Sequence, residues 1–281
     1  MYSQIRTSML DGICAMPVQV EVDISMGMPV FDMVGYLSPE VREAKERVRT
    51  ALHNCGILLP AKRITVNLSP ANIRKTGTGF DLPIAVALLV AMGLVKPEKC
   101  ADTIFSGELN LSGQLLPVRG ILPMVSDGVK EGIHKFVVPA DNLMESRLVQ
   151  GADVCGFPAL ESVIDYLQDG GYKEPAYAGR RQNRSHGVPD FSEVNGQQFL
   201  KRAAEIAASG MHNMLMVGPP GAGKTMISER MATILPPLTK KEQLEVSKIY
   251  SVCGLLADSR TLLQERPFRS PHHTVSMAGL A

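Results

Sequence analysis

Eight consecutive residues near the carboxyl end of the chain have the types and spacing needed to hold a triphosphate. They read Gly218-Pro219-Pro220-Gly221-Ala222-Gly223-Lys224-Thr225, which is the pattern G-x-x-x-x-G-K-[ST]. Glycines lack a Cβ, so the backbone N–H groups can wrap closely around phosphate oxygens. In such a loop the lysine, Lys224, is the catalytic residue that neutralises the β and γ oxygens, and the Thr225 hydroxyl is a ligand of Mg²⁺. The segment therefore predicts a site for a nucleoside triphosphate with Mg²⁺.

The elements around this loop are those that a phosphate loop requires. The apolar run 214–217 before it is expected to be a strand, and a helix should follow to about Leu235. The positive end of that helix would face the phosphates. Further helices are expected over 196–209 and 239–250. Strand, glycine loop and helix form the beginning of a P-loop α/β module.

The first 168 residues alternate strand-like and helix-like segments. Val18 to Ile24 alternates apolar and polar residues, as a half-buried strand does. Ser38-Pro39-Glu40 has the residue types of a helix start, and Gly56 is a natural stop for that helix. The other expected elements are strands at 63–68, 135–138 and 153–155, a hairpin over 107–118, and helices over 82–92, 121–131, 142–149 and 160–167.

Composition changes between residues 169 and 189, which contain glycines, Pro175 and a polar run with three arginines. Such a segment buries little and is expected to be a linker. Its arginines could contact nucleic acid or could be a solvated charged stretch.

Bulk properties exclude several classes of protein. The chain has 281 residues, a net charge of +1 and five scattered cysteines without C-x-x-C spacing, so neither a disulfide framework nor a zinc site is predicted. No apolar run reaches the roughly 18 residues of a membrane helix, and the amino terminus lacks a signal-peptide pattern. We expect a cytoplasmic protein with no membrane partner, whose charge leaves a nucleic-acid partner open.

Several stretches outside the phosphate loop resemble one family in the order in which they occur. Asp190 to Ala203 looks like the first helix region of an AAA+ ATPase, in which the Val-x-Gly-Gln stretch, here with Val194 and Gly196, lies beside the adenine. Arg266-Pro267-Phe268-Arg269-Ser270-Pro271-His272-His273 matches the magnesium-chelatase-like branch. Upstream, the segments 20–24, 63–70 and 80–85 are similar to the amino-terminal domain of the YifB/ComM proteins. The chain thus resembles the YifB/ComM family of Mg chelatase-like AAA+ ATPases.

The resemblance implies an α/β protein with two domains. Residues 1–168 would be a Lon-protease-like (ChlI-type) α+β domain related to ribosomal protein S5 domain 2, residues 169–189 a linker, and residues 190–281 the amino-terminal part of the AAA+ domain. It also implies ATP and Mg²⁺ as cofactors, a homo-hexamer in the full-length protein, and DNA as a partner in branch migration during DNA uptake.

The Lon resemblance can be compared with this sequence residue by residue. The Lon serine nucleophile lies in a Gly-Pro-Ser-Ala-Gly turn, and Gly79 stands at the serine position here. No lysine occurs in 120–124, where the resemblance places the activating base. Thr78 is adjacent but lacks a base, and a hydroxyl without an activating partner is a weak nucleophile. We expect this domain to be proteolytically inactive.

Two further groups of residues invite a functional interpretation. Lys62, Arg63, Arg74 and Lys75 flank one expected strand and its turn, and either form a basic rim for phosphates or a dispersed, solvated surface. Adjacent side chains on an extended segment point to opposite faces, so His272 and His273 are poorly placed to share a metal. For these two histidines the family motif suggests a loop beside the substrate surface of a ring.

A working ATPase of this type also needs an aspartate, usually with a glutamate, at the end of a second strand, and an arginine from a neighbouring subunit. No apolar run after Thr225 ends in Asp-Glu, and Asp258 is the nearest acid after such a run. We expect a truncated protein that binds nucleotide weakly and hydrolyses it very slowly. Three functions remain open: an ATP-driven DNA motor, a chelatase-like remodeller of proteins or metal insertion, and a non-catalytic nucleotide-binding fragment.

Overall fold

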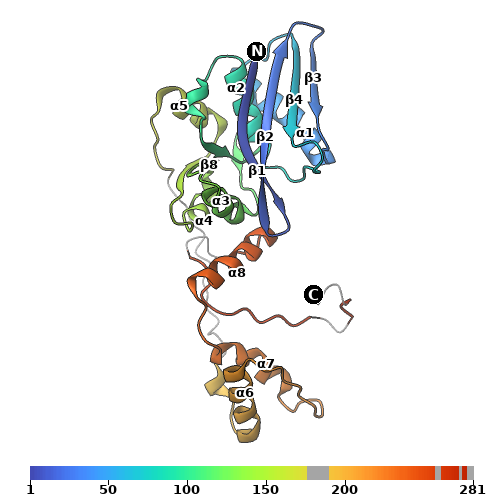
Figure 1. Ribbon diagram of the computed structural model, residues 1–281, viewed down its shortest axis with the longest axis vertical. Helices are drawn as coiled ribbons and strands as arrows, with labels where there is room; N and C mark the ends of the chain where they lie inside the picture. Colours follow the sequence, from blue (N-terminus) through green and yellow to red (C-terminus); the bar gives the residue numbers. More distant parts are fainter. Residues whose placement is uncertain (176–189, 257–260, 272–273, 277–281) are drawn as a thin grey trace. The chain divides into compact units, whose positions relative to one another are not determined.

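The structure is a computed structural model that describes residues 1–175, 190–256, 261–271 and 274–276 (Figure 1). The chain divides into two compact units, one of residues 1–181 with 247–261 and one of residues 182–246 with 262–281. Each unit is described by itself. No helix among the described residues is long and apolar enough to cross a membrane.

The first unit is built on a seven-stranded sheet with the strand order β3-β4-β2-β1-β5-β8-β9. The pairs β3–β4, β1–β5, β5–β8 and β8–β9 are parallel, whereas β1–β2 and β2–β4 are antiparallel. This mainly parallel sheet with helices confirms the predicted α/β class. The strands are β1 (Tyr2–Asp11), β2 (Cys14–Ser25), β3 (Val30–Val34), β4 (Arg63–Ser69), β5 (Thr103–Phe105), β8 (Lys135–Pro139) and β9 (Asp153–Phe157).

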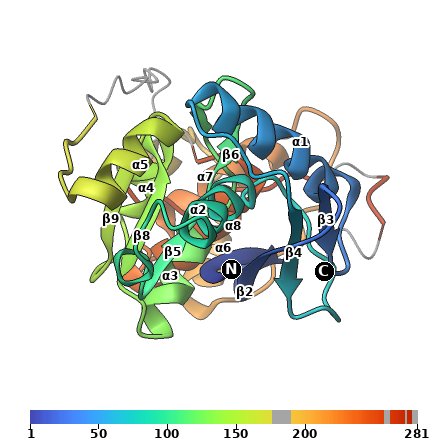
Figure 2. The same cartoon turned by 90° about the horizontal axis from the view of Figure 1, so that it is seen from above.

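Helices lie on both faces of this sheet (Figure 2). Side chains alternate between the two faces along β1. On one face the Ser3 hydroxyl donates to the Ala87 carbonyl of α2 (Asp81–Ala91), which is buried along its whole length. Helix α1 (Pro39–Asn54) packs beside α2. On the other face, Leu10 lies against Gly120 at the start of α3 (Ile121–Lys130).

The predicted helix start at Ser38-Pro39 and the hairpin over 107–118 are both present. The hairpin strands are short, β6 (Glu108–Leu109) and β7 (Leu115–Leu116), and they pair in antiparallel fashion. The helix expected over 142–149 is only one turn long. The remaining elements of the first unit are η1 (Pro97–Lys99), η2 (Ala140–Asn142), α4 (Leu143–Ser146) and α5 (Leu160–Asp169).

The second unit is helical. Its elements are η3 (Phe191–Glu193), α6 (Gln198–Gly210), α7 (Lys224–Met231), η4 (Ala232–Ile234) and the beginning of α8 (Lys240–Cys253), whose residues from Ser247 onward belong to the first unit.

The strand predicted at 214–217 is wrong for this structure, because these residues have no regular secondary structure. Leu215 and Val217 leave 88% and 89% of their surface exposed. A strand forms only where a neighbour pairs with its backbone. The described residues of the second unit contain no strand with which this run could pair.

Candidate nucleotide site

The predicted phosphate loop is a turn that leads directly into helix α7. Gly221 and Gly223 have φ angles of 80° and 83°, in the left-handed region that side chains strain. The Ala222 N–H donates to the Pro219 carbonyl at 3.3 Å, and the Ile227 N–H donates to the Gly223 carbonyl at 3.0 Å. The N–H groups in the first turn of a helix have no partner within that helix. They are therefore available to an anion held by the loop.

Lys224 is the first residue of α7, and its side chain folds back onto the loop. The Lys224 Nζ donates to the Gly218 and Pro219 carbonyls, both at 2.8 Å. The ammonium thus lies over the loop that would wrap the phosphates, and it is positioned by the loop's own backbone. The next residue, Thr225, is exposed in the first helical turn. The structure thus places both predicted ligand groups at one end of α7.

The segment with Val194 and Gly196 is attached to the same helix. Val194 is fully buried in the second unit, whereas Gly196 is exposed with a φ angle of 69°. Glu193, which precedes Val194, forms an ion pair with Arg230 at 2.7 Å. A second bond joins the Phe191 N–H to the Thr233 hydroxyl at 3.2 Å. Sequence reasoning missed the Glu193–Arg230 pair, because nothing in the spacing of 37 residues indicates that they meet.

Arg266, the first residue of the 266–273 motif, contacts the turn that precedes α8. Its Nε donates to the Pro236 carbonyl at 2.7 Å, and its Nη2 lies 3.2 Å from Glu242 Oε1. Glu242 also accepts hydrogen bonds from the N–H and hydroxyl of Thr239 at the start of α8. The Thr239 N–H, the Thr239 hydroxyl and Arg266 hold the pKa of Glu242 below its usual range. Arg266 thus links the turn before α8 to the first turn of that helix, and its guanidinium group is bound to other protein groups.

Comparison with known proteins gives this arrangement a family. Residues 20–142 match the family described as subunit ChlI of Mg-chelatase, and residues 190–281 match magnesium chelatase, subunit ChlI. The chain is 39% identical over 283 residues to YifB of Escherichia coli K12, covering 99% of this chain and 54% of YifB. It is 38% identical over 286 residues to competence protein ComM of Haemophilus influenzae, covering 98% of this chain and 54% of ComM.

The chain belongs to the YifB/ComM family. It spans about half the length of the curated relatives that it matches. The amino-terminal part of this family member is also similar to Lon protease homolog 2, peroxisomal, of rice, at 23% identity over 168 residues. That match covers 54% of this chain and 19% of the Lon homologue.

In this family member Gly79 stands at the position that corresponds to the Lon serine, and Ser106 lies where a side chain at that position would be. A Cβ on Gly79 would lie 2.9 Å from the Ser106 hydroxyl oxygen. Ser106 is buried, and its hydroxyl donates to the Met124 sulfur at 3.7 Å. Met124 is in the stretch where Lon-type enzymes place the activating lysine. The hydroxyl beside Gly79 therefore has a thioether as its neighbour, which cannot act as a base.

We expect Gly79→Ala to lower the free energy of unfolding by about 1–3 kcal/mol, because the added methyl group collides with Ser106. The loss should shrink when Ser106→Gly is added, which removes the colliding oxygen. Urea unfolding of Gly79→Ala, of Ser106→Gly and of the double variant measures the coupling between the two positions. Gly171→Ala is the matched control, since nothing lies within 4 Å of its Cβ position. If Gly79→Ala lowers the free energy of unfolding equally with and without Ser106→Gly, the added methyl group does not collide with Ser106.

The basic rim proposed around residues 62–75 is wrong for one of its members. Lys75 is fully buried, and its Nζ donates to the carbonyls of Pro70 and of Ile73, the latter at 2.9 Å. Burial lowers the pKa of Lys75. Arg63 lies 3.4 Å from Asp32, and Arg74 lies over the Tyr36 ring at 6.0 Å. Each of these three side chains contacts a different partner, so together they do not form a single phosphate-binding surface.

Other sequence expectations fall outside the described residues. His272, His273, Asp258 and the linker arginines are all in this category. Among the residues that the structure does describe, no three His, Cys, Asp or Glu side chains are grouped so that they could hold a metal ion.

Proposed function

We propose that residues 218–225 bind ATP with Mg²⁺ and that a full-length protein of this type is an AAA+ ATPase. The observation that supports this most is the loop itself, in which two glycines in the left-handed region, the Lys224 ammonium and the first turn of α7 lie together. Lys224 would neutralise the phosphate charge and Thr225 would ligate Mg²⁺ bound to the nucleotide. In this proposal residues 1–168 form the Lon-like domain and residues 190–281 the beginning of the AAA+ domain.

Val194 and Gly196 would adjoin the adenine in this proposal. Their attachment to α7 through Glu193–Arg230 supports it, since the base and the triphosphate must be held at a fixed separation. The ion pair would keep the segment 190–196 at a constant position on the helix that begins with Lys224.

We further propose that the full-length protein is a cytoplasmic homo-hexamer that acts on DNA as a helicase or branch-migration motor. The similarity to competence protein ComM supports this choice. A second candidate, a chelatase-like remodeller of proteins or metal insertion, is favoured by the two matches to the ChlI subunit of Mg-chelatase.

Turnover measurements on a full-length protein that contains this chain separate the two candidates. We expect forked or branched DNA to increase the rate of ATP hydrolysis several-fold, and Lys224→Ala to abolish both the basal and the stimulated rate. The 281-residue chain should hydrolyse ATP no faster than its own Lys224→Ala variant, because no apolar run after Thr225 ends in Asp-Glu. ATP turnover that no DNA structure changes would favour the remodeller.

A further inference from the structure

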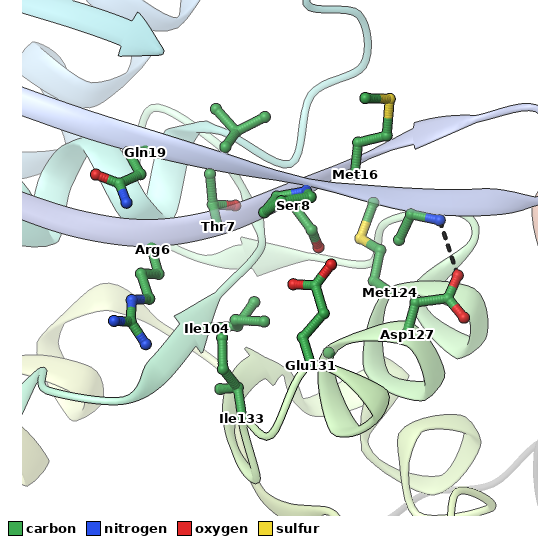
Figure 3. A pocket seen from close by; sticks show the side chains of 14 residues that line it. Arg6, Thr7, Ser8, Met16, Gln19, Ile104, Met124, Asp127, Glu131 and Ile133 are labelled. Atoms are coloured by element: carbon green, nitrogen blue, oxygen red, sulfur yellow. Dashed lines mark hydrogen bonds between the residues drawn. The ribbon is translucent and has the colours of Figure 1, made fainter. Parts of the chain in front are cut away.

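A cavity of about 190 Å³ lies in the first unit, between β1, β2 and the end of α3 (Figure 3). It exists because β1 and β5 pair at a single position, Arg6 with Ile104, while β1 continues to Asp11 beside β2. Helix α3 approaches the sheet closely at Gly128, whose missing side chain leaves room for Ile104 and Phe136. The space between the end of α3 and the first two strands therefore stays open.

One buried hydroxyl group that faces this cavity has no hydrogen-bond partner among the described residues. It belongs to Ser8, which is 7% exposed and lies on the same face of β1 as Leu10. A buried polar group without a partner costs about 1–3 kcal/mol, so such groups are normally paired with protein, water or a ligand. Figure 3 shows the Ser8 side chain turned toward the cavity and toward Glu131.

Two of the three charged residues that line the cavity are held in ion pairs. Arg6 forms an ion pair with Asp102 at 3.0 Å. Asp127 accepts from the Ala15 N–H and pairs with Lys130 and Lys248, both at 2.8 Å. Glu131 is exposed and forms no ion pair within the described part of the chain, and its carboxylate points toward Ser8 (Figure 3). The carboxylate and the Ser8 hydroxyl form the polar end of the cavity.

The apolar part of the lining includes Ile104, Met124 and Ile133. At about 30 Å³ for each water molecule, the volume corresponds to about six waters, which is room for a ligand of five or six non-hydrogen atoms. An occupant must therefore be slender and apolar, with a donor-rich cationic end for Glu131 and Ser8.

We propose that this cavity binds a primary ammonium group on an aliphatic stem of about four carbons. The ammonium donates to the Glu131 carboxylate and to the Ser8 hydroxyl, and the methylene groups pack against the methionine and isoleucine side chains. Anions are disfavoured because the Glu131 carboxylate lines the space. A neutral alcohol could fill the same volume but would form no charge-assisted hydrogen bond with Glu131. A lysine side chain and a free aliphatic amine share this chemistry.

Titration of the ¹⁵N-labelled 281-residue chain with n-butylammonium chloride tests the proposal. We expect saturable shifts of the backbone amide signals of Ser8, Gln19, Gly128 and Glu131 in the low millimolar range. Glu131→Gln should weaken binding about tenfold, because it removes the charge from a charge-assisted hydrogen bond. Ser8→Ala should weaken it about threefold. Glu98→Gln, at an exposed acid outside the cavity, is the matched control.

Butan-1-ol and acetate at the same concentrations should give no saturable shifts at these amides. Nα-acetyl-lysine methylamide and 1,5-diaminopentane distinguish the two sources of the ammonium group, and tighter binding of either one identifies the source. Absence of saturable binding by all three amines would overturn the proposal. So would binding of butan-1-ol as tight as that of butylammonium, or an unchanged affinity in a folded Glu131→Gln variant.

Discussion

Replacing Arg47 by methionine is expected to lower the free energy of unfolding of the first unit by about 3–5 kcal/mol, which is the usual cost of removing one partner from a buried ion pair. Arg47 binds the fully buried Asp81 through two bonds, Nε to Oδ2 at 2.7 Å and Nη2 to Oδ1 at 2.9 Å. Without it, the Leu109 N–H at 3.0 Å is the donor that remains to Asp81 among the described residues. Burial raises the pKa of Asp81 and the Arg47 bonds lower it, so without Arg47 the carboxyl group either stays charged without its partner or takes up a proton.

The pair also connects three elements, since Arg47 is in α1, Asp81 begins α2 and Leu109 is in β6. Urea unfolding followed by circular dichroism measures the loss. Arg42→Met, at an exposed arginine on the same helix, is the control and should cost little. The double variant Arg47→Met/Asp81→Leu should recover much of the lost stability, because a buried pair replaced by apolar groups is often nearly neutral. Equal losses for Arg47→Met and Arg42→Met would contradict a structural role for the pair.

Replacing Lys224 by alanine is expected to weaken ATP binding about 10- to 100-fold. A hydrogen bond to a charged group contributes about 1.5–3 kcal/mol, and each 1.4 kcal/mol is a factor of ten in affinity. The Lys224 ammonium donates to the Gly218 and Pro219 carbonyls, so part of its gain on phosphate is offset by the loss of these bonds. For this reason we do not expect a larger effect.

AMP provides an internal comparison for Lys224, because it lacks the β and γ phosphates that the lysine would contact. Its affinity should change little in Lys224→Ala, whereas that of ATP should fall. Lys241→Ala, at an exposed lysine of α8, should leave both unchanged. An equal loss of AMP and ATP binding in Lys224→Ala would mean that the substitution disturbs the whole loop and that the lysine has no specific role at the outer phosphates.

Local signals in the sequence were sufficient to predict several elements. Ser38-Pro39 marks the start of α1, and the apolar run from Leu82 marks α2. The phosphate loop was also predictable, because its glycines and lysine are contiguous and their geometry is set by local backbone conformation.

Elements that depend on distant partners were not predictable in the same way. Strand β1 was missed because its sequence, Tyr2–Asp11, mixes polar and apolar residues, and it becomes a central strand only through β2 and β5. The run 214–217 shows the opposite case, since its apolar residues look like a strand and find no neighbour. Strand formation is thus decided by pairing as much as by propensity.

The chemistry of individual side chains was hidden for the same reason. Lys75 looks like a surface charge in the sequence, and only the fold of 70–75 around its ammonium makes it a buried residue. The absence of a nucleophile at Gly79 was readable from the sequence. The position of Ser106 beside Gly79 could not be read from the sequence, because these residues are brought together by the packing of α2 and β5.

Titration of the 281-residue chain with ATP, with Mg²⁺ or with EDTA, tests the central claim that residues 218–225 hold a triphosphate with its metal. We predict saturable binding that Mg²⁺ strengthens about tenfold in the wild type, as expected if the Thr225 hydroxyl ligates the ion. The Thr225→Ala variant should bind ATP with the same affinity in Mg²⁺ and in EDTA. Absence of saturable ATP binding, or an undiminished Mg²⁺ effect in Thr225→Ala, would contradict the account.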